Sequence, residues 1–321
     1  MKQTLFIAVA MLSAWLFAPS SLGEESSVWT EFLEQAQDKF GDEGAEAARF
    51  LANNRPERDE QIGLDLLIEN LDYALRAKQA FPWAKTLDGD LFMNDVLPYA
   101  IVDETREAWR ASMHERASSI VNEAETATEA AQALNRELFN TINVHYNTGR
   151  KKPNQSIGES IEQGRATCTG LSIILVNACR SVGIPARLAG VANWHDGRGN
   201  HTWVEIWDGK NWRFTGADEY NKNGLDLAWF TADASKATAG DPVFGVWATS
   251  WKKTGHQFTM SWNDQDRSVH AVDVTHRYAS DSQIAANEST HATRLIRVRS
   301  TNAGERLIAQ LELINAEGTL T

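Results

Sequence analysis

Residues 166–170 read Ala-Thr-Cys-Thr-Gly and open an apolar segment that decides how this chain folds. Its large aliphatic and small apolar residues recur at three- and four-residue steps, which is the spacing of one helix face: Leu171, Ile174, Leu175, Ala178 and Val182. Gly183 then suits the position just after a helix, and Pro185 prevents continuation. We therefore predict a helix over residues 167–182 with Cys168 at its N-terminal end.

The position of Cys168 favours a chemical use of its thiol. Unpaired backbone N–H groups and the positive end of the helix dipole favour thiolate over thiol there, and the same N–H groups can hold a developing oxyanion. The competing interpretation is a buried structural cysteine, the common fate of free thiols. We assign that fate to Cys179, late in the same helix. A disulfide is excluded, because 11 residues of helix separate the sulfurs by roughly 16 Å.

A second stretch provides a histidine and a carboxylate. Residues 201–207 read His-Thr-Trp-Val-Glu-Ile-Trp, residues 212–218 read Trp-Arg-Phe-Thr-Gly-Ala-Asp, and residues 208–211 have a turn composition. If Trp207 pairs with Trp212, the register places His201 opposite Asp218 on one face of a hairpin. A carboxylate in that place fixes the imidazole tautomer and stabilises the imidazolium.

The register also separates two neighbouring acids. Glu219 points to the opposite face from Asp218 in a regular strand, so Asp218 is the predicted partner of His201. A bulge near Gly216 would shift the phase by one residue and give that part to Glu219. The sequence leaves this alternative open.

No metal or cofactor is predicted. The rival histidine, His195, lies in a turn of mostly solvated residues, and residues 196–200 lack the spaced acids of a calcium loop. No zinc-ligand spacing is present. We therefore expect catalysis, where it occurs, to rely on protein side chains alone.

The organisation of the chain indicates an α+β protein. Helical periodicity extends from about residue 31 to 143, and short strands with Gly/Asn turns follow the Cys168 helix, which favours an antiparallel sheet. We predict four segments: a signal peptide at 1–23, a helical region at 24–133, a catalytic core at 134–280 and a β-rich extension at 281–321.

Charge and the N-terminus limit where the protein acts. The formal net charge of −12 over 321 residues argues against a nucleic-acid partner. Lys2, the 13-residue apolar run from Leu5 to Phe17 and the small residues of 21–23 are typical of a secretory signal, with an uncleaved anchor as the alternative. We expect an exported protein, in the periplasm, secreted or at the cell surface, with no membrane span once the signal is removed.

Tryptophan is concentrated around the predicted hairpin. Seven of the 12 tryptophans lie between Trp194 and Trp251. Trp194 and Trp203 are candidates for the walls of a substrate cleft, although core packing accounts for Trp203 equally well.

Three blocks carry a family resemblance. Thr167-Cys-Thr-Gly170, residues 178–187 (Ala-Cys-Arg-Ser-Val-Gly-Ile-Pro-Ala-Arg) and residues 200–205 (Asn-His-Thr-Trp-Val-Glu) resemble the transglutaminase-like superfamily, especially its secreted bacterial branch. The resemblance covers roughly 134–278. It implies a papain-like α+β fold in which Cys168, His201 and Asp218 form a catalytic triad.

Two features depart from the family pattern. Many members carry the acid four residues after a tryptophan, where this chain has Gly216, with Asp218 and Glu219 just beyond. A side-chain oxyanion donor upstream of the cysteine is also hard to place. Gln155 is the candidate, with a plain loop residue as the alternative.

The resemblance implies acyl transfer on a protein, peptide or other amide substrate. Water would resolve the thioester in a peptidase or amidase, and an amine would resolve it in a cross-linking transglutaminase. Hydrolysis is favoured, because bacterial members more often resemble peptidases. The alternative from another class is a non-catalytic scaffold protein that binds polysaccharide or peptide at the cell surface.

Overall fold

The computed structural model describes residues 27–278, 313–315 and 318–320. The predicted signal peptide at 1–23 and most of the predicted extension at 281–321 lie outside the described residues. In that extension, β8 (Leu313–Asn315) pairs antiparallel with β9 (Gly318–Leu320).

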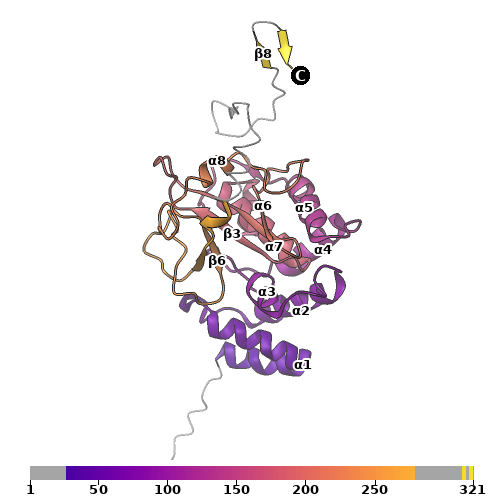
Figure 1. Ribbon diagram of the computed structural model, residues 1–321. Coiled ribbons are helices and arrows are strands. Elements are labelled where there is room, and N and C mark those ends of the chain that lie inside the picture. Colours follow the sequence, from indigo (N-terminus) through magenta and orange to yellow (C-terminus); the bar gives the residue numbers. More distant parts are fainter. Residues whose placement is uncertain (1–26, 279–312, 316–317, 321) are drawn as a thin grey trace, which may run out of the picture.

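The first part of the chain forms a helical layer with its own core. It comprises α1 (Val28–Asn54), η1 (Glu57–Asp59), α2 (Leu64–Ala80) and α3 (Gly89–Asp95). Apolar side chains from these helices pack together, among them Phe32, Leu51, Leu67 and Phe92. Figure 1 shows this layer, in indigo and violet, at one end of the molecule.

Four further helices belong to the second core. They are α4 (Arg110–Ile120), α5 (Ala127–Ile142), α6 (Ile157–Gln163) and α7 (Cys168–Ser181). Side chains of α4 and α5 join those of α7 and the sheet in one hydrophobic cluster. The predicted boundary at residue 133 therefore falls inside α5, and the helices that support α7 begin well before it.

The helix α7 is the central element of this core. It begins at Cys168, and every later residue to Ser181 is buried. Gly183 follows in the left-handed region, at φ 75°, and its N–H donates to the Arg180 carbonyl at 3.1 Å. The predicted start and end of this helix are confirmed.

Five antiparallel strands form the main sheet, in the order β5-β4-β3-β6-β7. Their bounds are β3 (Ala186–Val191), β4 (His201–Trp207), β5 (Trp212–Thr215), β6 (Trp247–Ser250) and β7 (His270–Asp273), with the short α8 (Thr231–Ala234) between β5 and β6. The remaining strands, β1 (His145–Tyr146) and β2 (Arg165–Ala166), pair in parallel just before α7. This mixed architecture confirms the predicted α+β class.

The hairpin register is correct as far as it extends. Trp207 pairs with Trp212 and Glu205 with Phe214, as predicted, but the ladder ends at Val204 and Thr215. The predicted pairing of His201 with Asp218 is therefore not part of the ladder. Asp218 has φ 61°, and a left-handed residue ends the alternation of faces on which the prediction depended.

Among the helices that the structure describes, none combines the length and the apolar character needed to cross a bilayer.

Candidate active site

A small pocket lies where α7, β4 and the segment after β5 meet. Its walls include the cysteine and the histidine singled out from the sequence, and the full set is Tyr146, Cys168, Leu171, His201, Thr202, Gly216, Ala217 and Glu219. Residues far apart in the chain thus converge on one small space.

Cys168 is the first residue of α7 and the only one in that helix that is not buried. The preceding residue, Thr167, makes no side-chain cap to the helix; its hydroxyl instead accepts a hydrogen bond from Arg150 Nε at 3.2 Å. Backbone N–H groups of the first turn therefore remain directed toward the helix end, beside the sulfur. This is the environment in which a thiolate and an oxyanion are stabilised.

His201 is the first residue of β4 and is 7% exposed. Aromatic rings surround its imidazole: Trp229 at 4.8 Å between ring centroids, Phe230 at 5.0 Å and Trp194 at 6.0 Å. These rings restrict the orientations open to the imidazole. They also form part of a continuous aromatic cluster behind the pocket.

A hydrogen bond joins the two elements next to Cys168 and His201. The hydroxyl oxygens of Thr169 and Thr202 lie 3.2 Å apart, and both side chains are buried. Because each threonine directly follows Cys168 or His201, this contact fixes the start of α7 against the start of β4.

The two candidate acids point to different partners. The carboxylate of Asp218 lies 3.2 Å from Nδ1 of His145, on the exposed side of the site, and its backbone N–H donates to Asn135 at 2.9 Å. Glu219 lines the pocket with Cys168 and His201. Of the two acids, Glu219 is the one among the lining residues of the pocket.

Comparison with known families agrees with this geometry. The segment from residue 114 to 217, which holds both Cys168 and His201, matches the family model of the transglutaminase-like superfamily. We refer to residues 114–217 as the transglutaminase-like core, after the family model that they match. The match begins within α4, as the hydrophobic cluster around α7 does.

A solved structure is similar to part of this chain. A crystal structure of a "putative cysteine protease" from Cytophaga hutchinsonii aligns at 23% identity and a TM-score of 0.33. The alignment covers 44% of this chain and 46% of that one, so the chain spans less than half of its length. No curated protein sequence matches at a significant level.

Two of the predicted accessory residues lie elsewhere in the transglutaminase-like core. Trp203 is fully buried, stacks on Phe230 at 4.6 Å and donates its indole N–H to Tyr278, so it packs in the core and does not wall a cleft. Trp194 is 4% exposed and contacts the site through the His201 ring. Both tryptophans therefore support the histidine from behind.

Gln155 is fully buried and its side-chain amide is engaged within its own loop. Its Nε2 donates to Arg165 O at 2.8 Å and to Ser160 Oγ at 3.3 Å, and its Oε1 accepts from the Lys151 N–H. Both amide hydrogens are thus used to hold the loop to β2 and α6. Gln155 is not among the lining residues of the pocket, whereas Cys168 and Leu171 of α7 are.

Sequence reasoning missed three residues of the site. Tyr146 lines the pocket from β1, His145 contacts Asp218, and Trp229 donates its indole N–H to Glu219 Oε1 at 3.1 Å. Trp229 lies in a segment without strand or helix periodicity, so its residue type was the sole signal in the sequence for a place at the site. Tyr146 and His145 sit on a two-residue strand, which is too short to give a pattern.

Proposed function

We propose that this chain is an exported cysteine-dependent enzyme that cleaves amide bonds through a thioester on Cys168. The observation that carries the proposal is the shared pocket, with a partly exposed thiol at a helix start and a ring-enclosed imidazole on the adjoining strand. That combination of groups is the one that nucleophilic cysteine catalysis requires.

Each step of the proposed reaction has a group in the pocket. The Cys168 thiolate attacks the amide carbonyl carbon, and first-turn N–H groups of α7 stabilise the oxyanion. As the C–N bond breaks, protonated His201 gives its proton to the leaving amine and a thioester remains. His201 then removes a proton from water, hydroxide attacks the thioester, and the acid and free thiol are released.

Hydrolysis is proposed over transfer because the sequence resembles the bacterial branch of the superfamily, whose members more often resemble peptidases. The two outcomes share the thioester and differ only in what resolves it. In transfer, a primary amine takes the place of water and forms a new amide with the acyl group.

Trapping of the acyl enzyme tests this proposal. The purified protein is mixed with a library of peptides and simple amides, with and without a primary amine, and Cys168 is inspected by mass spectrometry. We expect an acyl adduct on Cys168 and free acid as the product. The matched variants are Cys168→Ala, which should abolish both, and Cys179→Ala, which should retain both.

The same experiment separates the alternatives. New amides formed with the added amine would favour cross-linking over hydrolysis. The absence of any adduct, together with peptide or polysaccharide binding that Cys168→Ala leaves unchanged, would favour the scaffold function and contradict the proposed enzyme.

Export is proposed on the basis of the apolar run from Leu5 to Phe17 and the small residues that follow it. Cleavage after Gly23 would leave Glu24 as the first residue. N-terminal sequencing of the protein recovered outside the cytoplasm tests this, and a protein that retains Met1 in the membrane fraction would instead indicate an uncleaved anchor.

A further inference from the structure

Gly216 occupies a position where a side chain is excluded by one particular neighbour. A Cβ added there would lie 2.2 Å from Oε2 of Glu219 and 2.8 Å from its Cδ. Gly216 is not among the glycines with positive φ, so its backbone does not itself call for glycine. The Glu219 carboxylate, folded back over the main chain, fills the space that a side chain at 216 would take.

That space lies at the pocket that holds the imidazole. Gly216 directly follows Thr215, which forms the last pair of the β4–β5 ladder with Val204. Gly216, Glu219 and His201 all line the pocket. A carboxylate over Gly216 therefore lies beside the same small space as the His201 side chain.

Trp229 connects the same carboxylate to the imidazole. Its indole N–H donates to Glu219 Oε1 at 3.1 Å, while its ring centroid lies 4.8 Å from that of His201. One carboxylate oxygen is thus held by the indole, and the other lies over Gly216. The carboxylate is fixed by the residue that also contacts the histidine ring.

The neighbouring acid is engaged elsewhere. Asp218 adopts φ 61°, and its carboxylate meets His145, whose side chain is 47% exposed. Asp218 thus contacts a half-exposed histidine, whereas Glu219 lines the pocket together with the enclosed His201.

We infer that Glu219 is the positioning residue for His201, and that residue 216 is glycine because the Glu219 carboxylate takes the place of a side chain there. The inference rests on the proposed function, since it assigns the group that orients the imidazole for reaction with Cys168. Its chemistry is the stabilisation of one tautomer and of the imidazolium by a carboxylate.

Alkylation of Cys168 by iodoacetamide at neutral pH, followed by peptide mass spectrometry, provides the readout. Glu219→Gln should lower the rate about tenfold, because the imidazolium loses its counter-charge. Asp218→Asn should stay within about twofold of wild type, since its exposed ion pair contributes little. Glu162→Gln, the same chemical change on an exposed residue of α6, is the matched control.

Moving the carboxylate from residue 219 to residue 216 tests whether Glu219 positions His201 or only fills space. In the double variant Gly216→Asp/Glu219→Ala, the carboxylate enters the same space from residue 216. We expect its Cys168 alkylation rate to exceed that of Glu219→Ala about fivefold or more. Thermal unfolding of each variant shows that the rates compare folded proteins.

Several outcomes would overturn the assignment. A Glu219→Gln variant that reacts like wild type would do so, as would a loss of rate in Asp218→Asn of the size expected for Glu219. If Cys168 of the wild-type protein itself reacts like an ordinary thiol, the proposed function fails and this assignment fails with it. The wild-type rate is therefore measured first.

Discussion

At the scale of single residues, the two cysteines show how position determines chemistry. They lie on one helix, yet Cys168 is partly exposed at its first turn while Cys179 is fully buried among aliphatic side chains. Burial raises the pKa of the Cys179 thiol to about 12, so this residue remains protonated at neutral pH. Cys179 fills space in the core, and only Cys168 has access to a substrate.

The indole of Trp229 provides a residue-scale prediction. Trp229→Phe keeps an aromatic ring against His201 but removes the N–H that donates to Glu219. Loss of one hydrogen bond to a carboxylate, about 1.5 kcal/mol, should slow Cys168 alkylation several-fold, with a small change in thermal stability.

Trp212→Phe is the control for this change, because Trp212 contacts Trp207 across the hairpin and does not line the pocket. Equal alkylation rates in the two variants would show that the indole N–H does not serve the site.

Residue patterns predicted part of this site and could not predict the rest. The helix over 168–181 and the register to Thr215 follow from periodicity and turn composition, which are local properties. The left-handed conformation of Asp218 and the folding of Glu219 over Gly216 depend on contacts with Asn135 and Trp229, which are distant in the chain. Alternation of faces therefore did not reveal that Glu219 lines the pocket.

At the scale of elements, the site depends on how α7 meets β4. The hydroxyls of Thr169 and Thr202 are in contact at 3.2 Å, one residue beyond each reactive side chain. Strands β3 and β4 pair in antiparallel, from Ala186 opposite Ile206 to Val191 opposite His201. This register fixes where His201 lies along the sheet. The thiol and the imidazole are thus positioned by elements that are buried over most of their length.

Thr169→Val tests this junction. The substitution preserves shape but leaves the Thr202 hydroxyl buried without its partner, which should lower the free energy of unfolding by about 1–2 kcal/mol. We also expect slower alkylation of Cys168, because the start of α7 is less firmly held. Urea denaturation and the alkylation rate are the measurements.

The double variant Thr169→Val/Thr202→Val serves as the comparison, since removing both partners together leaves no buried hydroxyl. It should be more stable than Thr169→Val alone. A double variant that loses the sum of the two single effects would contradict a direct hydrogen bond.

The short helix α6 also shows which features the local sequence reveals and which it does not. The polar composition of residues 149–164 is typical of a loop, but 157–163 form α6, which begins with a capping box between Ser156 and Glu159. That capping box is visible in the sequence as Ser-x-x-Glu. The helix is only seven residues long, too short for periodicity to reveal, so the cap was its single local signal.

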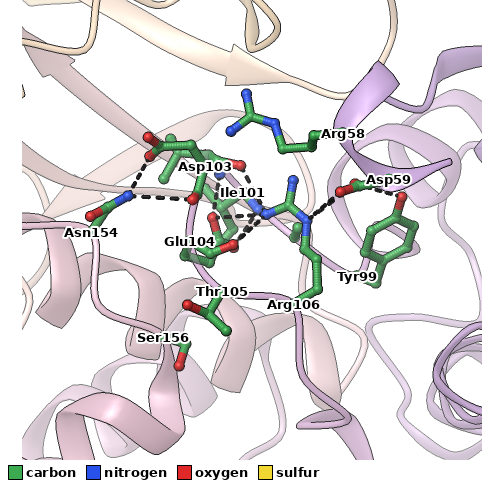
Figure 2. A network of polar contacts seen from close by, with 12 residues as sticks. Arg58, Asp59, Tyr99, Ile101, Asp103, Glu104, Thr105, Arg106, Asn154 and Ser156 are labelled. Atoms are coloured by element: carbon green, nitrogen blue, oxygen red, sulfur yellow. Dashed lines mark hydrogen bonds and ion pairs between the residues drawn. The ribbon is translucent and has the colours of Figure 1, made fainter. Parts of the chain in front are cut away.

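At the scale of the whole molecule, a buried polar network joins the helical layer to the transglutaminase-like core. Figure 2 shows Asp59 of η1 between Arg106 and Tyr99, with Arg106 Nε at 3.0 Å and the Tyr99 hydroxyl at 2.9 Å. Asp103 extends the network by accepting a hydrogen bond from Asn154 at 2.7 Å. Asp59 therefore anchors the N-terminal layer to residues 99–106, and Asn154 of the core contacts the same segment through Asp103.

Asp59→Ala tests the anchor. It leaves the Arg106 guanidinium, whose side chain is 13% exposed, without its nearest carboxylate. Loss of one partner of a buried pair should lower the free energy of unfolding by about 3 kcal/mol. Glu57→Ala, at an exposed position of the same turn, should change it by less than about 0.5 kcal/mol. Equal unfolding curves for the two variants would show that Asp59 does not anchor the helical layer.

A buried acid at the end of α3 gives the fold a pH dependence. Burial raises the pKa of Asp95, an effect that the positive charges of Arg187 and Arg180 offset only in part. Because the pKa is higher in the folded than in the unfolded chain, the stabilisation is complete below the unfolded value of about 4 and is lost as the pH rises above it.

Asp95→Asn removes this ionisation. We expect the free energy of unfolding of the variant to depend less on pH above about pH 4 than that of the wild type, with the variant relatively more stable at neutral pH. Urea denaturation across that range is the measurement. If the free energy of unfolding depends on pH to the same extent in the wild type and in the variant, the assignment is contradicted.

The central claim is that Cys168 and His201 act as one reacting pair. The most direct measurement is the rate of iodoacetamide modification of Cys168 at about pH 6 in wild type and in His201→Gln, with a free cysteine peptide as the reference thiol. We predict a wild-type rate at least about tenfold above that of an ordinary thiol, and its loss in His201→Gln. An ordinary rate in the wild type, or an unchanged rate in the variant, would contradict the account.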